Sequence, residues 1–300
     1  IGMGTTSNKY LKLLYDTPEI GHDRNWTYFN EFNQDTDWLD EVRQTAMTWD
    51  NNFSMSGGGD KANYFMSLGY LKDDGTTIST SLERMNTSLD ISYQFSNKLK
   101  FGANFAYSQT DKDSDWTSNL RSEAFSKMPN KSPYWIDKET GERTSQYFSY
   151  QTEDFEGNFT ADSKRKSSNY NPVAMAHESI NNSLQKEAKL TFRADYNILP
   201  GFSYKAWASI NMRTLKNRLF LPQVATGVVW TSKYANQSTD GYSDQMDLQT
   251  ENKLMYVKNW AEKHNIIATA VVRTSQTERS SYTSTTSGNP SPGLSDPIIG

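Results

Sequence analysis

Residues 84–95 read RMNTSLDISYQF, and this stretch decides the fold class because its apolar side chains recur at every second position. An apolar side chain or a threonine occupies each odd position, and a polar side chain occupies each even one. Side chains alternate between the two faces of a β-strand, whereas in a helix these two sets would be mixed on every side. The stretch is therefore predicted to form a strand with one apolar face and one polar face.

The same alternation continues on both sides of this stretch. A short turn at Ser96-Asn97 leads into residues 99–107, whose odd positions are again apolar. Two strands joined so tightly must be antiparallel neighbours. Three more hairpins are predicted in the same way, around turns near residues 57–60, 198–201 and 262–265. Their strands are predicted at residues 52–56, 62–70, 188–197, 202–213, 254–260 and 266–273.

The predicted strands and loops together favour a barrel. The pattern gives about eight strands in four hairpins, each of roughly 10–12 residues, which is longer than the 5–6 of ordinary soluble sheets and long enough to cross a bilayer when tilted. Short turns alternate with longer loops at about 73–83, 110–185 and 214–250, and aromatic residues flank the apolar faces, as in outer-membrane barrels. We predict an all-β fold, an antiparallel transmembrane β-barrel with long extracellular loops.

These patterns also predict how the chain is organised. The predicted regions are 1–49, a loop and strand region leading into the barrel; 50–109, barrel strands; 110–185, a long extracellular loop; 186–213, a barrel hairpin; 214–250, an extracellular loop; 251–275, a barrel hairpin; and 276–300, the start of another extracellular loop.

The composition agrees with this prediction and excludes several other classes. The 300 residues carry a formal net charge of -4 and no cysteine, which excludes disulfides and thiol chemistry and gives no general argument for nucleic-acid binding. The longest strictly apolar run is residues 173–176, whereas a transmembrane helix needs about 20. The chain begins with Ile1 and shows no signal-peptide pattern, so we expect a processed chain or an internal piece of a longer one.

No motif points to catalysis or to a bound metal. Residues 111–115 read DKDSD and resemble the start of a calcium loop, but Ser122 stands where the bidentate glutamate is needed. The three histidines, His22, His177 and His264, are too far apart for a helical metal-binding pair. We therefore predict no catalytic residue, no metal site and no cofactor, and a protein that is not an enzyme.

Aromatic residues are the candidate ligand-binding residues. Flat aromatic faces suit sugar rings and also peptides, although packing within the loops is the plainer explanation for any one of them. Trp207 differs from the others because it lies on the polar face of its predicted strand. The candidates are Trp116, Tyr134, Trp135, Tyr147, Trp207, Trp230 and Tyr234.

The alternation also assigns the two faces of the predicted wall. Lipid is expected to contact the apolar set, which includes Met85, Leu89, Ile91, Phe101, Phe105, Leu190 and Phe192. The lumen is expected to be lined by the polar set, which includes Arg84, Asp90, Lys100, Arg193, Asp195, Lys205 and Arg213.

Three stretches, taken in order, resemble SusC/RagA-type TonB-dependent transporters. They are DTDWLDEV at residues 35–42, NFSMSGG at 52–58 and YFMSLGYL at 64–71. The later parts of the chain that also fit are Gly75, Glu83-Arg84, the strand at residues 99–104 and the turn at 263–265.

The resemblance implies an outer-membrane protein of Bacteroidetes. Its relatives have a 22-stranded barrel, an N-terminal plug, a segment that contacts TonB and a SusD-like surface lipoprotein as an outer lid. Such a protein imports glycans or peptides, powered through TonB, and has outer-membrane lipid around its barrel.

The chain also departs from the family pattern. No plug, TonB-contacting segment or barrel-closing strand is evident, and eight strands are too few for the implied barrel. We therefore expect an internal portion with two unpaired sheet edges, which would not fold independently. The alternatives are a passive porin or structural barrel, and a soluble or surface-anchored glycan-binding β-protein such as a sandwich.

Overall fold

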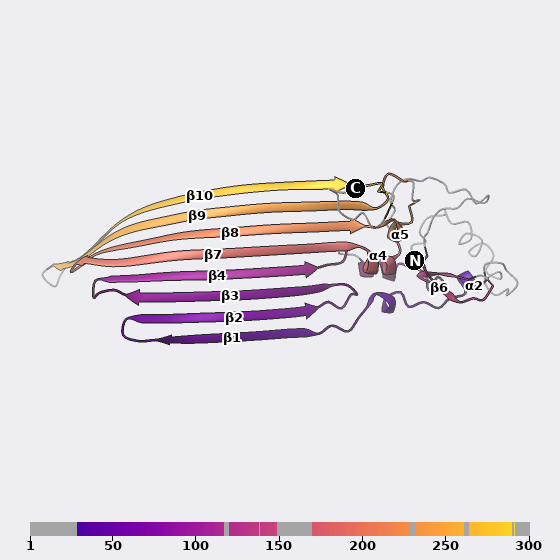
Figure 1. Cartoon of the computed structure of the whole chain (residues 1–300), viewed down its shortest axis with the longest axis horizontal. Helices are drawn as coiled ribbons and strands as arrows, with labels where there is room; N and C mark the ends of the chain where they lie inside the picture. Colours follow the sequence, from indigo (N-terminus) through magenta and orange to yellow (C-terminus); the bar gives the residue numbers. More distant parts are fainter. Residues whose placement is uncertain are drawn as a thin grey trace.

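The protein is dominated by one large antiparallel sheet (Figure 1). The computed structural model describes residues 29–116, 120–137, 139–148, 170–228, 232–260, 264–289 and 291. The sheet has eight strands in the order β1-β2-β3-β4-β7-β8-β9-β10. Their bounds are β1 Thr48–Gly58, β2 Ala62–Asp74, β3 Ser81–Gln94, β4 Leu99–Asp113, β7 Ile180–Leu199, β8 Phe202–Leu221, β9 Gln237–Trp260 and β10 His264–Thr286.

Short elements lie at the end of the sheet opposite the hairpin turns (Figure 1). They are the helices α2 Phe29–Phe32, η2 Asp40–Val42, α3 Leu120–Phe125, α4 Pro172–Glu178 and α5 Gln223–Thr226, and the two-stranded sheet of β5 Tyr134–Ile136 and β6 Arg143–Tyr147. We call these short elements and their connecting segments the crown. No helix within the described residues is long and apolar enough to span a membrane.

The predicted hairpins and pairing are confirmed. Each of β1–β2, β3–β4, β7–β8 and β9–β10 is an antiparallel pair joined by a short connection. The all-β antiparallel class is confirmed with them, and Ile91 and Phe105 lie on the same face as predicted because the register pairs Leu89 with Phe105 and Ile91 with Ala103. The register also places Asp90 beside Asn104 on the opposite face.

The strands are longer than predicted, and several loop boundaries were wrong. The sheet has strands of 11–15 residues in its first half and 20–24 in its second. Parts of the predicted loops 73–83, 110–185, 214–250 and 276–300 therefore belong to strands. Much of these extensions is polar on both faces, as at residues 237–245 and 276–286, so no hydropathy alternation marks those parts, although the backbone ladder continues.

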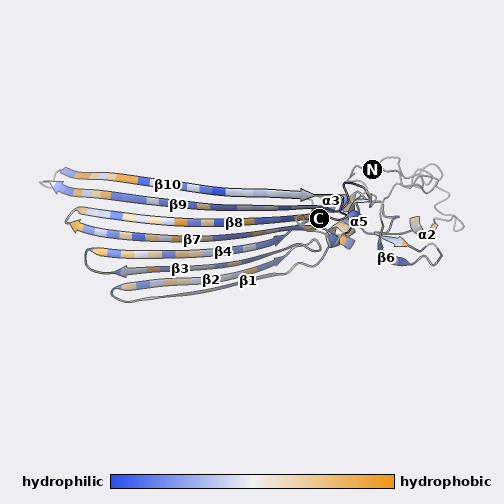
Figure 2. Ribbon diagram, turned by 45° about the horizontal axis from the view of Figure 1, so that its top comes forward, coloured by the Kyte–Doolittle hydropathy of each residue, from blue (hydrophilic) through white to orange (hydrophobic). Residues whose placement is uncertain are grey.

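The apolar face of the sheet is a continuous band across the strands. In register, Met66, Leu89, Phe105, Leu190, Ile210 and Leu248 form one row of it. Hydrophobic colour gathers in the half of the sheet nearest the hairpin turns, and the strands become more hydrophilic toward the crown (Figure 2). Ile91 and Phe192 remain 43% and 42% exposed, so nothing within the described residues packs over this face as a second sheet of a sandwich would.

The band drifts along the strands from one edge of the sheet to the other. On β3 it covers residues 85–93, whereas on β10 its residues are Ile266 to Val272, which pair with β9 between Asn252 and Lys258. An apolar band that follows the bilayer must be level with it. Such a band can cross the register rows of the sheet obliquely only if the strands are tilted relative to the band. That stagger is the geometry of a barrel wall.

Candidate functional site

The polar face of the sheet carries charged side chains that pair across strands. The pairs are Arg193–Asp90, Arg213–Glu187, Arg273–Glu251 and Lys205–Asp195, with N···O distances of 2.8, 3.2, 2.5 and 4.0 Å. All of them remain partly exposed, so each contributes little to stability. Their arrangement instead makes this face a hydrated, charged surface.

One of these pairs depends on a glycine. Arg193 on β7 reaches Asp90 on β3 by passing over β4 at Gly102, which is its cross-strand neighbour. A Cβ atom at Gly102 would lie 3.5 Å from Arg193 Nε, which is an ordinary contact distance, so the guanidinium passes close over this residue and a side chain longer than alanine would meet it. Asn104 donates to the same carboxylate at 3.3 Å. The glycine thus allows side chains from three strands to meet on the polar face.

Trp207 lies on this polar face, as predicted. It is half-buried, and its cross-strand neighbours are Arg193 on β7 and Glu251 on β9. Its place on the wall separates it from the crown candidates. Contact between Trp207 and a ligand stays a prediction.

The crown packs around two small buried clusters. The first combines Leu120, Ala174, Met175, Ala176, Leu221 and Ala225, and the second combines Trp38, Val42, Ala124 and Val173. Because Leu221 is the last residue of β8, the first cluster joins the crown to the sheet. Helix α4 contributes to both clusters and therefore lies at the centre of the crown.

Asn171 connects three crown segments through hydrogen bonds. Its Nδ2 donates to the carbonyls of Pro133 and Phe148 at 2.7 and 2.9 Å. Its Oδ1 accepts from the backbone N–H groups of Val173 and Ala174, which caps the N-terminus of α4. The side chain is fully buried, so this amide fixes α4 against the β5–β6 hairpin.

The structure brings several candidate aromatic residues together in the crown. Trp116 and Tyr147 pack on the first cluster, and Tyr134 and Tyr147 pack on the second. The rings of Tyr134 and Tyr147 stack with centroids 5.2 Å apart, and Trp135 contacts Phe148 edge-on at 4.7 Å. These contacts give the aromatic residues a role in packing the crown. Their contact with a ligand stays a prediction.

Of the last two candidates, Tyr234 is the one that the structure describes. Tyr234 is half-buried, and the Lys233 ammonium lies 5.2 Å from its ring centroid. Trp230 lies outside the described residues.

Burial shifts the pKa of two crown residues. Desolvation raises the pKa of Tyr147 to about 12, and the nearby Glu178 carboxylate, which accepts from the Tyr147 hydroxyl at 3.3 Å, adds to the shift. Desolvation lowers the pKa of Lys127 to about 8, against an opposing attraction from Glu123. Tyr147 was predicted only as a ligand-contacting residue and Lys127 was not a candidate; both pKa shifts reflect how closely the crown is packed.

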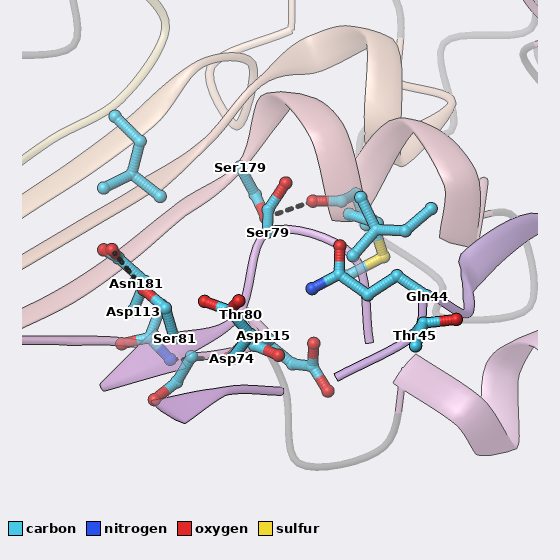
Figure 3. Close-up of a pocket in the computed structure, with 15 residues that line it drawn as sticks. Gln44, Thr45, Asp74, Ser79, Thr80, Ser81, Asp113, Asp115, Ser179 and Asn181 are labelled. Carbon is cyan, nitrogen blue, oxygen red and sulfur yellow. Dashed lines mark hydrogen bonds between the residues drawn. The ribbon is translucent and has the colours of Figure 1, made fainter. Parts of the chain in front are cut away.

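A pocket of about 490 Å³ lies where the crown meets the ends of β2, β3, β4 and β7 (Figure 3). Sequence reasoning did not predict it, because its lining comes from segments far apart in the chain. The one sequence signal was the acidic run at residues 111–115, which contributes Asp113 and Asp115 to the lining. No group of three potential metal-ligating side chains occurs in the part of the chain that the structure describes.

Sequence comparison finds TonB-dependent receptors. The chain is 23% identical over 240 residues to TonB-dependent receptor P3 of Formosa agariphila, covering 77% of this chain and 22% of that protein. It is 34% identical over 70 residues to TonB-dependent receptor SusC of Bacteroides thetaiotaomicron, covering 23% of this chain and 7% of SusC. No protein-family model matches the chain.

Structural comparison finds the same architecture. The RagAB peptide transporter matches with a TM-score of 0.66 and 19% identity, over 100% of this chain and 33% of the RagAB chain. The RagAB peptide importer in its open-open state matches with a TM-score of 0.64. At this identity the match shows the fold, which is that of part of a RagA-type barrel wall.

The two comparisons agree with each other and with the motifs at residues 35–71. The chain spans about a fifth of the length of the Formosa receptor that it matches. Over the parts that align, the chain is similar in sequence to TonB-dependent receptors, SusC among them, and its fold is that of part of a RagA-type barrel wall.

Proposed function

We propose that the protein containing this chain imports glycans or peptides across the bacterial outer membrane, powered through TonB. The observation that carries this proposal is that the two faces of one sheet differ in polarity. One face exposes a continuous apolar band, and the other carries Arg193, Asp90 and the neighbouring charged pairs. Lipid on one side and a hydrated lumen on the other would satisfy both faces at once.

The proposal includes the place and the partners of the protein. We infer an outer-membrane location as a multi-pass barrel, a SusD-like surface lipoprotein over the crown, and TonB contact through a segment outside this chain. The similarity to SusC and to the RagAB peptide transporter supports these inferences. The cargo class is left as glycan or peptide, because aromatic residues such as Trp207 suit both. The role is transport, with no chemical step on the cargo.

The test uses the native bacterium with the full-length gene. We expect deletion to abolish uptake of either a labelled oligosaccharide mixture or a labelled peptide mixture, and the complemented strain to restore it. Disrupting TonB should abolish the same uptake. Uptake that persists without TonB would favour a passive porin. Recovery of the protein from membranes without detergent would favour a soluble glycan-binding protein.

A further inference from the structure

The polar face of the sheet carries more positive than negative charge. Its four cross-strand ion pairs, described above, are each neutral. Six further cations on this face form no ion pair within the described residues: Arg84, Lys100, Lys112, Lys189, Lys253 and Arg279. Three carboxylates there also form none: Asp50, Asp73 and Asp247. The formal net charge of the chain is -4, so this face has the opposite balance to the whole chain.

The surplus is concentrated in one register row near the hairpin turns. Lys100, Asp195, Lys205 and Lys253 are successive cross-strand partners on β4, β7, β8 and β9, and we call them the basic row. The ion pair that Asp195 forms with Lys205 has an N···O distance of 4.0 Å. The row therefore sets one carboxylate against three ammonium groups.

Two of these lysines face each other without a carboxylate between them. Lys205 and Lys253 are direct partners across β8 and β9. Like charges that lie directly opposite each other destabilise a sheet. The Lys205 side chain is 53% exposed, so a soluble anion can reach it. An anion bound between the two ammonium groups would remove their repulsion.

An aromatic surface lies beside the basic row. Trp207 follows Lys205 by two residues on β8, so both side chains point to the polar face, about 7 Å apart along the strand. The half-buried indole offers a flat apolar surface, and the lysine offers a positive charge. A sugar ring that carries a carboxylate can contact both, because the ring and its substituent extend over a similar distance. An acidic peptide side chain supplies the charge without a ring to cover the indole.

We propose that the cargo is a negatively charged oligosaccharide, such as one built from uronic acids, and that the basic row and Trp207 bind it. The inference rests on the transport proposal, because it takes the polar face to be the wall of the lumen. A surface with a surplus of one charge sign concentrates ligands of the opposite sign. Lys189 and Arg84, which lie closer to the crown, extend this surplus along the path that the cargo would follow.

The test uses the full-length protein purified in detergent and a matched pair of probes. Trigalacturonate and its methyl ester have the same sugar backbone and differ in charge. In titration calorimetry we expect the acid to bind about tenfold more tightly than the ester, at the lower end of electrostatic enhancements. Raising sodium chloride to about 0.5 M should reduce this preference, because salt screens exposed charges.

Matched variants separate the charge of this face from the charge of the protein. Lys205→Gln/Lys253→Gln should lose the preference for the acid and keep the weaker binding of the ester. Lys186→Gln/Lys216→Gln removes two lysines from the opposite face of β7 and β8, so it should retain the preference. Heat-modifiable migration on gels should show that both variants retain the barrel.

Several results would overturn the proposal. Equal affinity for the acid and the ester would do so, as would a lack of binding by the acid. Tighter binding of the peptide Ala-Glu-Ala-Glu-Ala than of trigalacturonate would show that the cargo is not a sugar. Poor assembly of Lys205→Gln/Lys253→Gln with an unchanged preference would show that the row binds an acidic segment of the protein itself. Binding in detergent needs no TonB, so a loss of TonB-dependent uptake with the preference intact would contradict the transport proposal alone.

Discussion

At Asn171 one buried amide makes four side-chain hydrogen bonds, two to the start of its own helix and two to segments that lie far from it in the chain. Neither the sequence pattern nor composition marks this residue. Its importance comes from burial, because buried polar groups need hydrogen-bond partners and this one amide supplies them to the carbonyls of Pro133 and Phe148 and to the start of α4.

Replacing this side chain should loosen the crown without disturbing the sheet. Asn171→Ala removes the donor to the carbonyls of Pro133 and Phe148, at about 1 kcal/mol for each lost hydrogen bond, and removes the cap of α4. Limited proteolysis of the full-length protein should then cut within the crown. Asn171→Ser keeps a capping oxygen and should show an intermediate rate. Unchanged resistance of the alanine variant would contradict this account.

Lys127 gives the crown a dependence on pH. Its pKa is about 8 in the folded crown and about 10.4 in an unfolded chain. Between these two pKa values the unfolded chain binds more protons at Lys127 than the folded crown does. The free energy of unfolding therefore rises as the pH rises from about 8 to 10. Below pH 8 Lys127 is charged in both states, and the folded crown bears the full cost of burying that charge. Competitive acetylation with trace reagent should give a reactivity midpoint near pH 8. The denatured protein is the control, and a native midpoint above 10 would disprove the shift.

At the scale of the strand, two adjacent residues have different surroundings, because their side chains point to opposite faces of the sheet. Ile91 lies in the apolar band, and Ser92 points to the polar face beside Gly102. These two adjacent positions on β3 differ in face and little else, so they form a matched pair.

Ile91→Arg should impair assembly of the full-length barrel, because a charge at the bilayer midplane costs about 2–4 kcal/mol. Ser92→Arg should be tolerated, because its side chain enters a hydrated surface. Heat-modifiable migration of outer-membrane extracts measures the assembled fraction for each variant. Equal assembly of both variants would show that the faces are assigned wrongly.

The alternation at residues 84–95, together with the same pattern in seven other segments, was sufficient to predict eight strands, four hairpins and the faces of their strands. It failed where both faces of a strand are polar, as in β9 near Asp240 and Asp244, because hydropathy no longer alternates there. The crown aromatic residues were identified by type, but their contacts depend on packing between distant segments. The pocket was missed for the same reason, since Asp74 and Asp115 approach each other only through the register of β2, β3 and β4.

At the scale of the whole molecule, the sheet has two open edges within the described residues. Strands β1 and β10 each pair on one side only. An open sheet edge and an exposed apolar band both promote aggregation when no neighbouring segment covers them.

Residues 1–300 expressed alone should therefore aggregate. In size-exclusion chromatography without detergent we expect no monomer, and refolding into detergent should give no cooperative unfolding transition. The full-length protein, prepared in the same way, is the control. A soluble monomer that unfolds cooperatively would contradict the barrel-wall assignment.

The drift of the apolar band has a consequence for the outer rim. Strand β2 ends at Asp74, four residues past Tyr70, whereas β10 ends at Thr286, fourteen residues past Val272. With about 3.3 Å of rise per residue and a tilt of about 40°, the rim would stand about 25 Å higher at β10 than at β2. In a membrane such a sloping rim would let a bulky particle come closer to the bilayer on the β2 side than on the β10 side.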